Sequence, residues 1–286
     1  MFRVLTMKRV IAGVLLTMMF SCTGNKTAPA DSSTAVSADS TFVANDTAST
    51  DTLEQLIAEV PMPRAADELF DDFIFNYAAN PKLQMERTRF PIVVGGEENT
   101  DTISCGEWKT EHFFMRQGFY TLLLNSAQQR EEVKDTDVNQ VTVEKIYLED
   151  RRVKQYLFCR VNGLWMLTAI NNTSIAENAN ASFLDFYEHF ATDSTFQAAS
   201  LNPIVEFAGP DPDNDDSMME GIITDDTWPA FAPELPSGMI YNIVYGTPRP
   251  ATDQTIFLMR GIANGLELEM TFKKIDGKWK LTKLTT

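Results

Sequence analysis

The chain has 286 residues, of which 44% are hydrophobic and 22% charged, and its formal net charge at pH 7 is −16. This much apolar material excludes a wholly disordered or collagen-like chain, and the length allows one large domain or two ordinary ones. The acidic balance argues against nucleic acid and anionic lipid surfaces as partners, because binding to either requires a basic patch. Three cysteines and two histidines are too few for a disulfide scaffold or a multi-ligand zinc site, so we predict no metal and no cofactor.

The N-terminal segment, residues 1–21, has the layout of a signal peptide. It contains no acidic residue, and basic residues precede an apolar run that is too short for a comfortable membrane span. The run ends in Ser21 followed by Cys22, which resembles a bacterial lipobox, and this resemblance implies lipidation of Cys22. Met19 and Phe20 depart from the stricter lipobox pattern. The alternative is an ordinary secretory signal in which Cys22 is incidental.

Residues 22–52 are predicted to be a disordered tether. The segment consists mainly of Ser, Thr, Ala and Asp, and such a composition cannot bury enough apolar surface to offset the entropy of ordering. We therefore expect an exported protein of the cell envelope. A lipid at Cys22 would hold it in the outer membrane, where it would face the periplasm or the cell surface.

The rest of the chain contains the same pattern twice, beginning with a helix. Phe70, Phe73, Ile74 and Tyr77 have the spacing of one helix stripe, and an aromatic stripe with this spacing returns 113 residues later. Each stripe is followed by a residue that can cap a second helix, Asn80 in the first half and Asp193 in the second. The second stripe consists of Phe183, Phe186, Tyr187 and Phe190.

The closing segments of the two halves also match, at an offset of 114 residues. Residues 161–167 and 275–281 share the pattern Gly-x-Trp-x-Leu, preceded by Asn or Asp. Asn-Gly and Asp-Gly between apolar runs predict β-hairpins with a type I′ turn, which needs positive φ at two successive residues. Each half therefore ends in a hairpin.

Strand-like runs fill the interval between the helices and the final hairpin. Helices followed by strands predict an α+β fold with a mostly antiparallel sheet, arranged as two domains, residues 53–174 and 175–286. The runs are 108–115, 119–124 and 141–148 in the first half, and 228–231, 239–245 and 255–260 in the second.

From about residue 65 to residue 286, the doubled aromatic stripe and the doubled Gly-x-Trp-x-Leu ending resemble a known fold family. Helices followed by a curved antiparallel sheet are similar to the nuclear-transport-factor-2-like, or ketosteroid-isomerase-like, cone. The duplication behind a lipoprotein signal resembles a Bacteroides-type lipoprotein family of unknown function with tandem cones. The resemblance implies a cavity between helices and sheet, which hosts isomerases and dehydratases in some members and simple binding in others. Because no catalytic motif is included, it carries fold and location alone.

The two closing hairpins differ on their outer faces. In the second half, one face is apolar and the other carries lysines and threonines. The same alternation in the first half leaves its outer face apolar as well. Because an exposed apolar face invites association, we expect this outer patch to be covered by the second half, by a partner protein or by a second copy of the chain. Its residues are Leu157, Cys159, Val161, Leu164 and Met166.

Two cation–aromatic pairs are predicted at the rims of the hairpins. Arg160 lies opposite Trp165, and Lys274 lies opposite Trp279. A cation over an indole ring stabilises by roughly 0.5–1 kcal/mol. Because the pairing recurs in both halves, it favours a structural role over a ligand clamp.

Candidate chemistry is sparse. His112 is the best acid–base candidate, because it falls on a predicted strand of the first cone, but no orienting partner or pocket is visible for it. Cys105 and Cys159 would remain after lipidation of Cys22, and a disulfide between them is left open. The acidic loop 211–216 resembles the start of a calcium loop but lacks its glycine, which favours a solvated hairpin loop.

We therefore interpret the chain as a non-catalytic ligand- or protein-binding module whose partner is an envelope protein or a small apolar ligand. The alternative is an enzyme that performs proton transfer on a small apolar substrate in one of the cones. In that case a buried titratable side chain with a displaced pKa should project into the cone.

Overall fold

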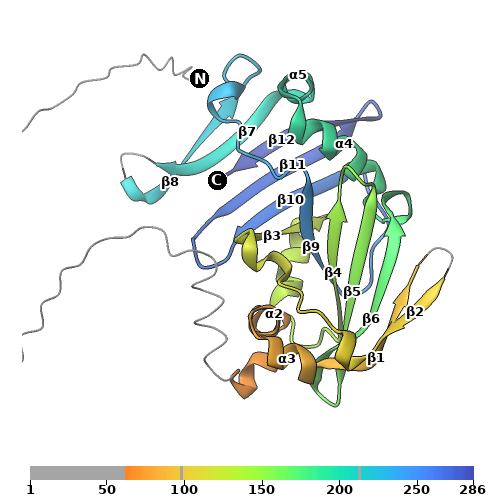
Figure 1. Cartoon of the computed structure of the whole chain (residues 1–286). Coiled ribbons are helices and arrows are strands. Elements are labelled where there is room, and N and C mark those ends of the chain that lie inside the picture. Colours follow the sequence, from red (N-terminus) through yellow and green to blue (C-terminus); the bar gives the residue numbers. More distant parts are fainter. Residues whose placement is uncertain (1–61, 97–98, 212–213) are drawn as a thin grey trace, which may run out of the picture. The chain divides into compact units, whose positions relative to one another are not determined.

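The structure is a computed structural model that describes residues 62–96, 99–211 and 214–286 (Figure 1). The predicted signal peptide, Cys22 and the tether therefore lie outside the described residues, as does part of the acidic loop at 211–216. None of the described helices is long and apolar enough to cross a membrane.

Both aromatic stripes form helices, as their spacing predicts. In each half a longer helix is followed at once by a short one, because the residue between them leaves helical geometry and caps the second helix. The side-chain oxygens of Asn80 and Asp193 each accept two backbone N–H groups of the helix that follows. The helices are α2 (Phe70–Ala79), α3 (Pro81–Glu86), α4 (Ala181–Thr192) and α5 (Ser194–Ala199).

The described strands belong to one mixed sheet, in the order β2-β1-β6-β5-β4-β9-β3-β10-β11-β12-β7-β8. Most neighbours are antiparallel, and the pairs β1–β6, β12–β7 and β3–β9 are parallel. The strands of the first half are β1 (Thr88–Gly95), β2 (Thr100–Ile103), β3 (Phe119–Leu124), β4 (Gln140–Tyr147), β5 (Arg152–Val161) and β6 (Leu164–Ser174). Those of the second half are β7 (Leu201–Asp211), β8 (Asn214–Ile223), β9 (Met239–Tyr245), β10 (Gln254–Gly261), β11 (Glu267–Ile275) and β12 (Lys278–Thr285).

Two of the predicted strands are wrong, and both fail for the same reason. Segments 108–115 and 228–231 form irregular chain and short 3₁₀ turns. The indole N–H of Trp108 donates to the side-chain oxygen of Gln84 on α3, and that of Trp228 donates to Gln197 on α5. Each tryptophan thus ties its segment to a helix, away from the strand ladder. The described 3₁₀ turns are η1 (Arg64–Asp67), η2 (Cys105–Glu107), η3 (Phe113–Arg116), η4 (Ala127–Lys134), η5 (Ile175–Glu177) and η6 (Trp228–Ala230).

The two halves exchange a strand, so the separate sheets implied by two independent domains are not found. β3 precedes β4 in the chain but pairs antiparallel with β10 of the second half. Conversely, β9 pairs with β4 of the first half along its whole length. The exchanged strands meet each other at a single parallel position, Thr121 beside Asn242. Each half therefore completes its sheet with a strand from the other, as swapped protomers do.

Two hydrophobic cores lie on opposite faces of this sheet. The alternation along the exchanged strands shows it, because Leu122 and Tyr241 join the core of the first half while Leu123 and Ile240 join the core of the second. Helix α2 packs in the first core and helix α4 in the second. The central strands are consequently covered on both faces.

Both closing hairpins form as predicted. The turn residues Asn162-Gly163 and Asp276-Gly277 have positive φ, between 50° and 81°, as a type I′ turn requires. The apolar face of each hairpin is buried in its own core, as the alternation of the sequence predicts. The core-facing residues are Tyr156, Phe158, Trp165, Leu167, Met270, Phe272, Trp279 and Leu281.

The prediction that the second half covers the outer patch is wrong. Val161 and Leu164 are 38% and 43% exposed, and Leu157, Cys159 and Met166 are half-buried. The physical reason is the strand exchange, which joins the halves along their sheet edges. Helix α4 consequently packs on β11 and β12, where Phe183 contacts the rings of Phe272 and Trp279, and of β5 and β6 only Val153 joins the second core. Cover by a partner or by a second copy stays a prediction.

Candidate functional site

Aromatic side chains fill the space between the helices and the sheet in each half. In the first half, the rings of Phe73 and Tyr77 lie 5.9 Å and 5.3 Å from the ring of Phe158, centroid to centroid. In the second half, Phe183 and Phe190 lie 5.3 Å and 5.1 Å from Phe272. These rings are at most 2% exposed, so they occupy the region where a cone fold would hold a ligand.

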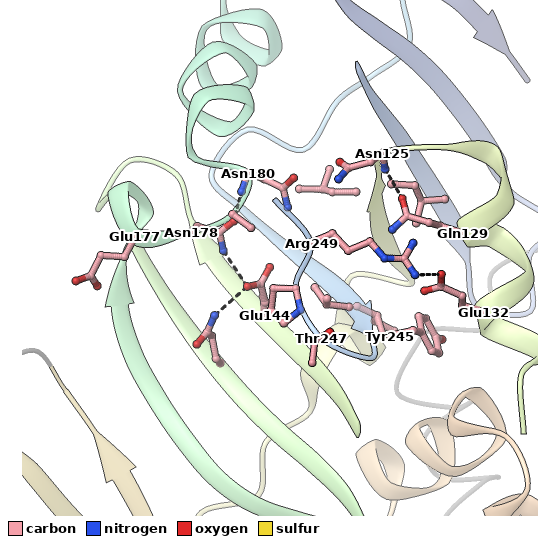
Figure 2. A pocket seen from close by; sticks show the side chains of 17 residues that line it. Asn125, Gln129, Glu132, Glu144, Glu177, Asn178, Asn180, Tyr245, Thr247 and Arg249 are labelled. Atoms are coloured by element: carbon pink, nitrogen blue, oxygen red, sulfur yellow. Dashed lines mark hydrogen bonds and ion pairs between the residues drawn. The ribbon is translucent and has the colours of Figure 1, made fainter. Parts of the chain in front are cut away.

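A cavity of about 220 Å³ lies outside both cores, on the sheet face opposite the first core (Figure 2). Its floor is formed by β4, β5 and β9. Its walls are η4, the loop that follows β9, and the linker at 177–180 that joins the two halves. The lining is mostly polar, and it contains one carboxylate on the floor, Glu144, which is 3% exposed.

The strand exchange explains why Glu144 has polar neighbours on both sides. Residues directly opposite each other on antiparallel strands share a face, and Glu144 lies opposite Gln155 on β5 and opposite Asn242 on β9. The amides of Gln155 and Asn178 donate to Glu144 Oε1, with N···O distances of 3.0 Å and 2.8 Å. The amide of Asn242 donates to Oε2 over 2.9 Å. Three neutral donors from three elements thus hold one buried carboxyl group.

Further hydrogen bonds fix the orientation of two of these amides. Asn178 Oδ1 accepts the backbone N–H of Asn180, and Asn242 Oδ1 accepts the backbone N–H of Leu123 on β3. Because the amide oxygens are engaged elsewhere, the NH₂ groups are the ends that face Glu144. Asn242 also satisfies a backbone N–H of β3, where the parallel pairing of the exchanged strands is limited to one position.

Burial raises the pKa of Glu144 above its ordinary value, although the hydrogen bonds from Asn242, Gln155 and Asn178 lower it in part. Desolvation penalises the charged form of a carboxyl group, while amide donors favour that form. Glu144 is therefore an acid that gains from a positive charge placed beside it, or that can hold a proton above the usual pH range.

An ion pair lies at the rim of the cavity. Arg249, from the loop after β9, bonds Glu132 on η4, and Figure 2 shows the guanidinium group directed toward Glu132 and away from Glu144. A further carboxylate, Glu177, belongs to the linker wall. The described lining residues thus include three acids and one base, and Figure 2 shows Glu177 directed away from Glu144.

A second carboxylate with several polar partners, the half-buried Glu111, lies in the first half. Its carboxylate accepts hydrogen bonds from the hydroxyls of Tyr156 and Tyr241 and contacts Lys145 Nζ at 3.2 Å. Burial alone would raise the pKa of Glu111, but the bond from Tyr156 and the charges of Lys145 and Lys154 outweigh it, so the pKa lies below its usual range. A carboxylate held in this way is a structural anchor.

The sequence-predicted rim pairs form as expected. The Arg160 guanidinium lies 4.6 Å from the Trp165 ring centroid, and Lys274 Nζ lies 4.9 Å from that of Trp279. Arg160 also donates to the backbone carbonyls of Asp67 and Val138. These contacts tie the hairpin to its surroundings, and none of the four residues lines the cavity over Glu144.

The remaining sequence candidates do not come together. His112 precedes the short turn η3 and is not on a strand, contrary to the prediction, because Trp108 and Glu111 bind Gln84 of α3. Cys105 and Cys159 are free thiols, so the disulfide that was left open does not form. Within the described ranges, no three His, Cys, Asp or Glu side chains cluster in a way that would hold a metal ion.

Sequence reasoning missed Glu144, Gln155, Asn178 and Asn242. A usable signal was present, because Asn242 interrupts an otherwise apolar or aromatic run from Met239 to Tyr245. A polar residue within a strand that is covered on both faces needs a buried partner. That signal becomes readable only once β9 is known to lie beside β4.

Comparison with known proteins places the chain in a family. It matches the family model "Domain of unknown function (DUF4348)" over residues 49–286. It is also similar to a crystal structure described as an NTF2-like protein from Bacteroides fragilis NCTC 9343, with 38% identity and a TM-score of 0.72; the alignment covers 79% of this chain and 98% of that one. No curated protein matches. The chain therefore belongs to the DUF4348 family, and its fold is NTF2-like.

Proposed function

We propose that this protein is a non-catalytic binding module of the cell envelope, built from two duplicated cones and anchored by a lipid at Cys22. Support for the anchor comes from the lipobox-like end of the apolar run and from the Ser/Thr-rich segment that follows it. Support for duplication comes from the repeated order of helices and strands and from the repeated Trp–Gln pair.

The observation that carries the binding role is the filling of both cones by aromatic side chains. An enzyme of the cone-pocket type needs room for a substrate between helices and sheet, and Phe73, Phe158 and Phe272 are fully buried in that region. Ligands and partners would then use surfaces outside the cones. The cavity over Glu144 and the outer patch are two such surfaces.

A second candidate is proton transfer by Glu144, which its raised pKa and its position on the floor of a cavity favour. General acid–base catalysis also needs a group that orients the substrate and a second group that completes the proton transfer. The described neighbours of Glu144 are amides, which donate hydrogen bonds but do not exchange protons at neutral pH. The binding role is therefore preferred.

The test creates a cavity inside one cone by removing an aromatic ring from its core. Phe158→Ala removes a ring from the first core, and an apolar cavity of this kind binds benzene. We expect benzene to raise the melting temperature of the variant and to leave that of the unmodified chain unchanged, as measured by thermal unfolding with circular dichroism. The variant itself should lose about 3–5 kcal/mol of unfolding free energy.

Phe272→Ala is the matched control in the second cone, and Phe158→Leu is the milder variant in case the alanine substitution prevents folding. Saturable binding of benzene by the unmodified chain, abolished by filling or reshaping one cone, would contradict the proposal. That result would show room for a substrate and favour the cone-pocket enzyme.

A further inference from the structure

We propose that the cavity over Glu144 binds a small organic cation that carries N–H groups, such as a primary ammonium, with its charge placed on the Glu144 carboxylate. This inference rests on the proposed binding function and names the class of ligand. Four observations carry it: the counterpart of the site in the other half, the unused capacity of the carboxylate, the charge of the lining and the orientation of the amides.

The second half provides an internal comparison for the Glu144 position. Phe158 and Phe272 are equivalent residues of the two closing hairpins, and counting along the ladders from each places Leu258 at the position of Glu144. The neighbour of Leu258 on the exchanged strand is Leu122, whereas the neighbour of Glu144 is Asn242. Both leucines are fully buried, and the position equivalent to Gln155 is occupied by Glu269, which is paired with Arg130.

The second half thus builds the same two positions from leucines, and its nearby buried acid has a cationic partner that Glu144 lacks among the described residues. A buried carboxyl group costs several kcal/mol of desolvation unless it is well compensated, and apolar residues of similar volume are often at least as stabilising. The compensation present here comes from neutral amides alone. A carboxylate offers about four acceptor positions, and three of them are occupied by these amides. The fourth is available on a side chain that lines the cavity.

The charge of the lining sets the sign of the ligand. The charged side chains that line this cavity are Glu132, Glu144, Glu177 and Arg249. Arg249 is paired with Glu132, and Figure 2 shows Glu177 directed away from Glu144, so the charge of Glu144 is left without a cation from this lining. A cavity with an uncompensated acid on its floor attracts positive charge and repels carboxylates and phosphates.

The amides distinguish an organic cation from a metal ion. A metal ion would need oxygen ligands, but the side-chain oxygens of Asn178 and Asn242 accept backbone N–H groups elsewhere. A ligand with N–H groups needs only acceptors, which Glu144 provides. Leu123, Val244 and Pro248 contribute apolar wall for a short aliphatic stem. The volume of about 220 Å³ is below the ~300–1,000 Å³ of drug-sized pockets, so the ligand is small.

The experiment uses the full chain and three probes of equal length: n-butylammonium, n-butanol and n-butyrate. Titration calorimetry at constant ionic strength and neutral pH should show n-butylammonium binding at least about tenfold more tightly than either comparator, which corresponds to about 1.4 kcal/mol. Glu144→Gln should weaken the binding of the amine about tenfold or more. Glu177→Gln is the matched control: it removes one acidic charge from an exposed side chain that is directed away from Glu144, keeps the capacity to cap η5, and should change the affinity less than about threefold.

A second measurement needs no variant. In the unmodified chain, n-butylammonium should shift the side-chain amide resonances of Asn178 and Asn242, and n-butyrate should leave them in place. Amide resonances that do not move with any probe would overturn the assignment of this cavity. Preferential binding of butanol or butyrate would overturn the cation and leave the binding module intact. Conversion of the bound amine into another compound would overturn the non-catalytic function and leave the site intact.

Discussion

Carboxylates of the first half hold the exchanged strand β9 through its side chains. Glu144 accepts a hydrogen bond from Asn242, and Glu111 accepts one from Tyr241. Asp71 on α2 accepts one from Tyr245, and burial raises the pKa of Asp71. The pKa shifts of these acids differ in direction. Burial dominates at Asp71 and Glu144 and raises the pKa, whereas the bond from Tyr156 and the charge of Lys145 dominate at Glu111 and lower it. They should therefore respond oppositely to pH.

The clearest pH prediction concerns Glu111. Its pKa is lower in the folded chain, so its contribution to stability is fully present above the unfolded pKa of about 4.3 and is lost as the pH falls through the folded value. We expect Glu111→Gln to lower the free energy of unfolding at pH 7 by about 1–3 kcal/mol. The difference from the unmodified chain should shrink as the pH falls below about 4.3, as urea unfolding at pH 7 and at acid pH would measure.

Glu220→Gln, at an exposed position on β8, is the control and should leave the free energy of unfolding unchanged at both pH values. An equal loss of stability at both pH values would show that Glu111 acts through packing and not through its charge. The raised pKa values of Asp71 and Glu144 have the opposite sign, because these groups favour the folded state most at low pH, and they will partly mask the effect in the unmodified chain.

The sequence predicted local features well and side-chain partners poorly. The helix stripes, the caps at Asn80 and Asp193 and the turns at Gly163 and Gly277 depend on neighbouring residues, so their spacing alone identifies them. The site at Glu144 depends on partners up to 98 residues away. No local pattern records such distances.

At the scale of elements, the strand exchange is the feature that local patterns could not predict. Each strand from 119–124 to 255–260 was placed correctly along the chain, except for the two tryptophan segments. Which strand lies beside which is decided by tertiary pairing, and the repeat suggested that β3 would stay with β4. Alternation along the hairpin correctly predicted the apolar outer patch. The prediction that the second half covers this patch was wrong, because the two halves are joined along their sheet edges.

The exchange predicts that neither half folds alone. A fragment of residues 53–174 lacks β9, and a fragment of residues 175–286 lacks β3, so each would expose an apolar sheet edge. We expect each isolated fragment to unfold without a cooperative transition and an equimolar mixture to recover the near-ultraviolet circular dichroism of the full chain.

The control is the full chain cut at the 174–175 junction, which should remain one particle in size-exclusion chromatography. Cooperative unfolding of either fragment as a monomer would contradict this expectation. It would mean that β3 can return to β4, or β9 to β10, at little cost.

At the scale of the whole molecule, the chain combines a predicted lipoprotein signal at its N-terminus with a folded part that carries two cores on opposite faces of one sheet. The NTF2-like fold was predicted from the doubled pattern and is borne out by the B. fragilis structure. The predicted lipoprotein signal rests on the sequence alone, because residues 1–61 lie outside the described part.

The predicted anchor has a direct test. Cys22→Ala removes the sulfur that a lipid would modify, so the variant should move from the membrane fraction to the soluble fraction of fractionated cells and should not incorporate labelled palmitate. Cys105→Ala, at an exposed free thiol, is the control and should stay with the membranes. A soluble unmodified chain would favour the ordinary secretory signal.

The exchange of β3 and β9 also determines when, during synthesis of the chain, each half can complete its sheet. A chain emerging from the ribosome presents β4 long before β9 exists, since 98 residues separate Glu144 from Asn242. Before β9 is made, no stage of elongation offers a completed first half, and pairing over such separations is slow. The first half can therefore be completed only when synthesis has reached the last sixth of the chain, and a chain truncated before β9 cannot complete it.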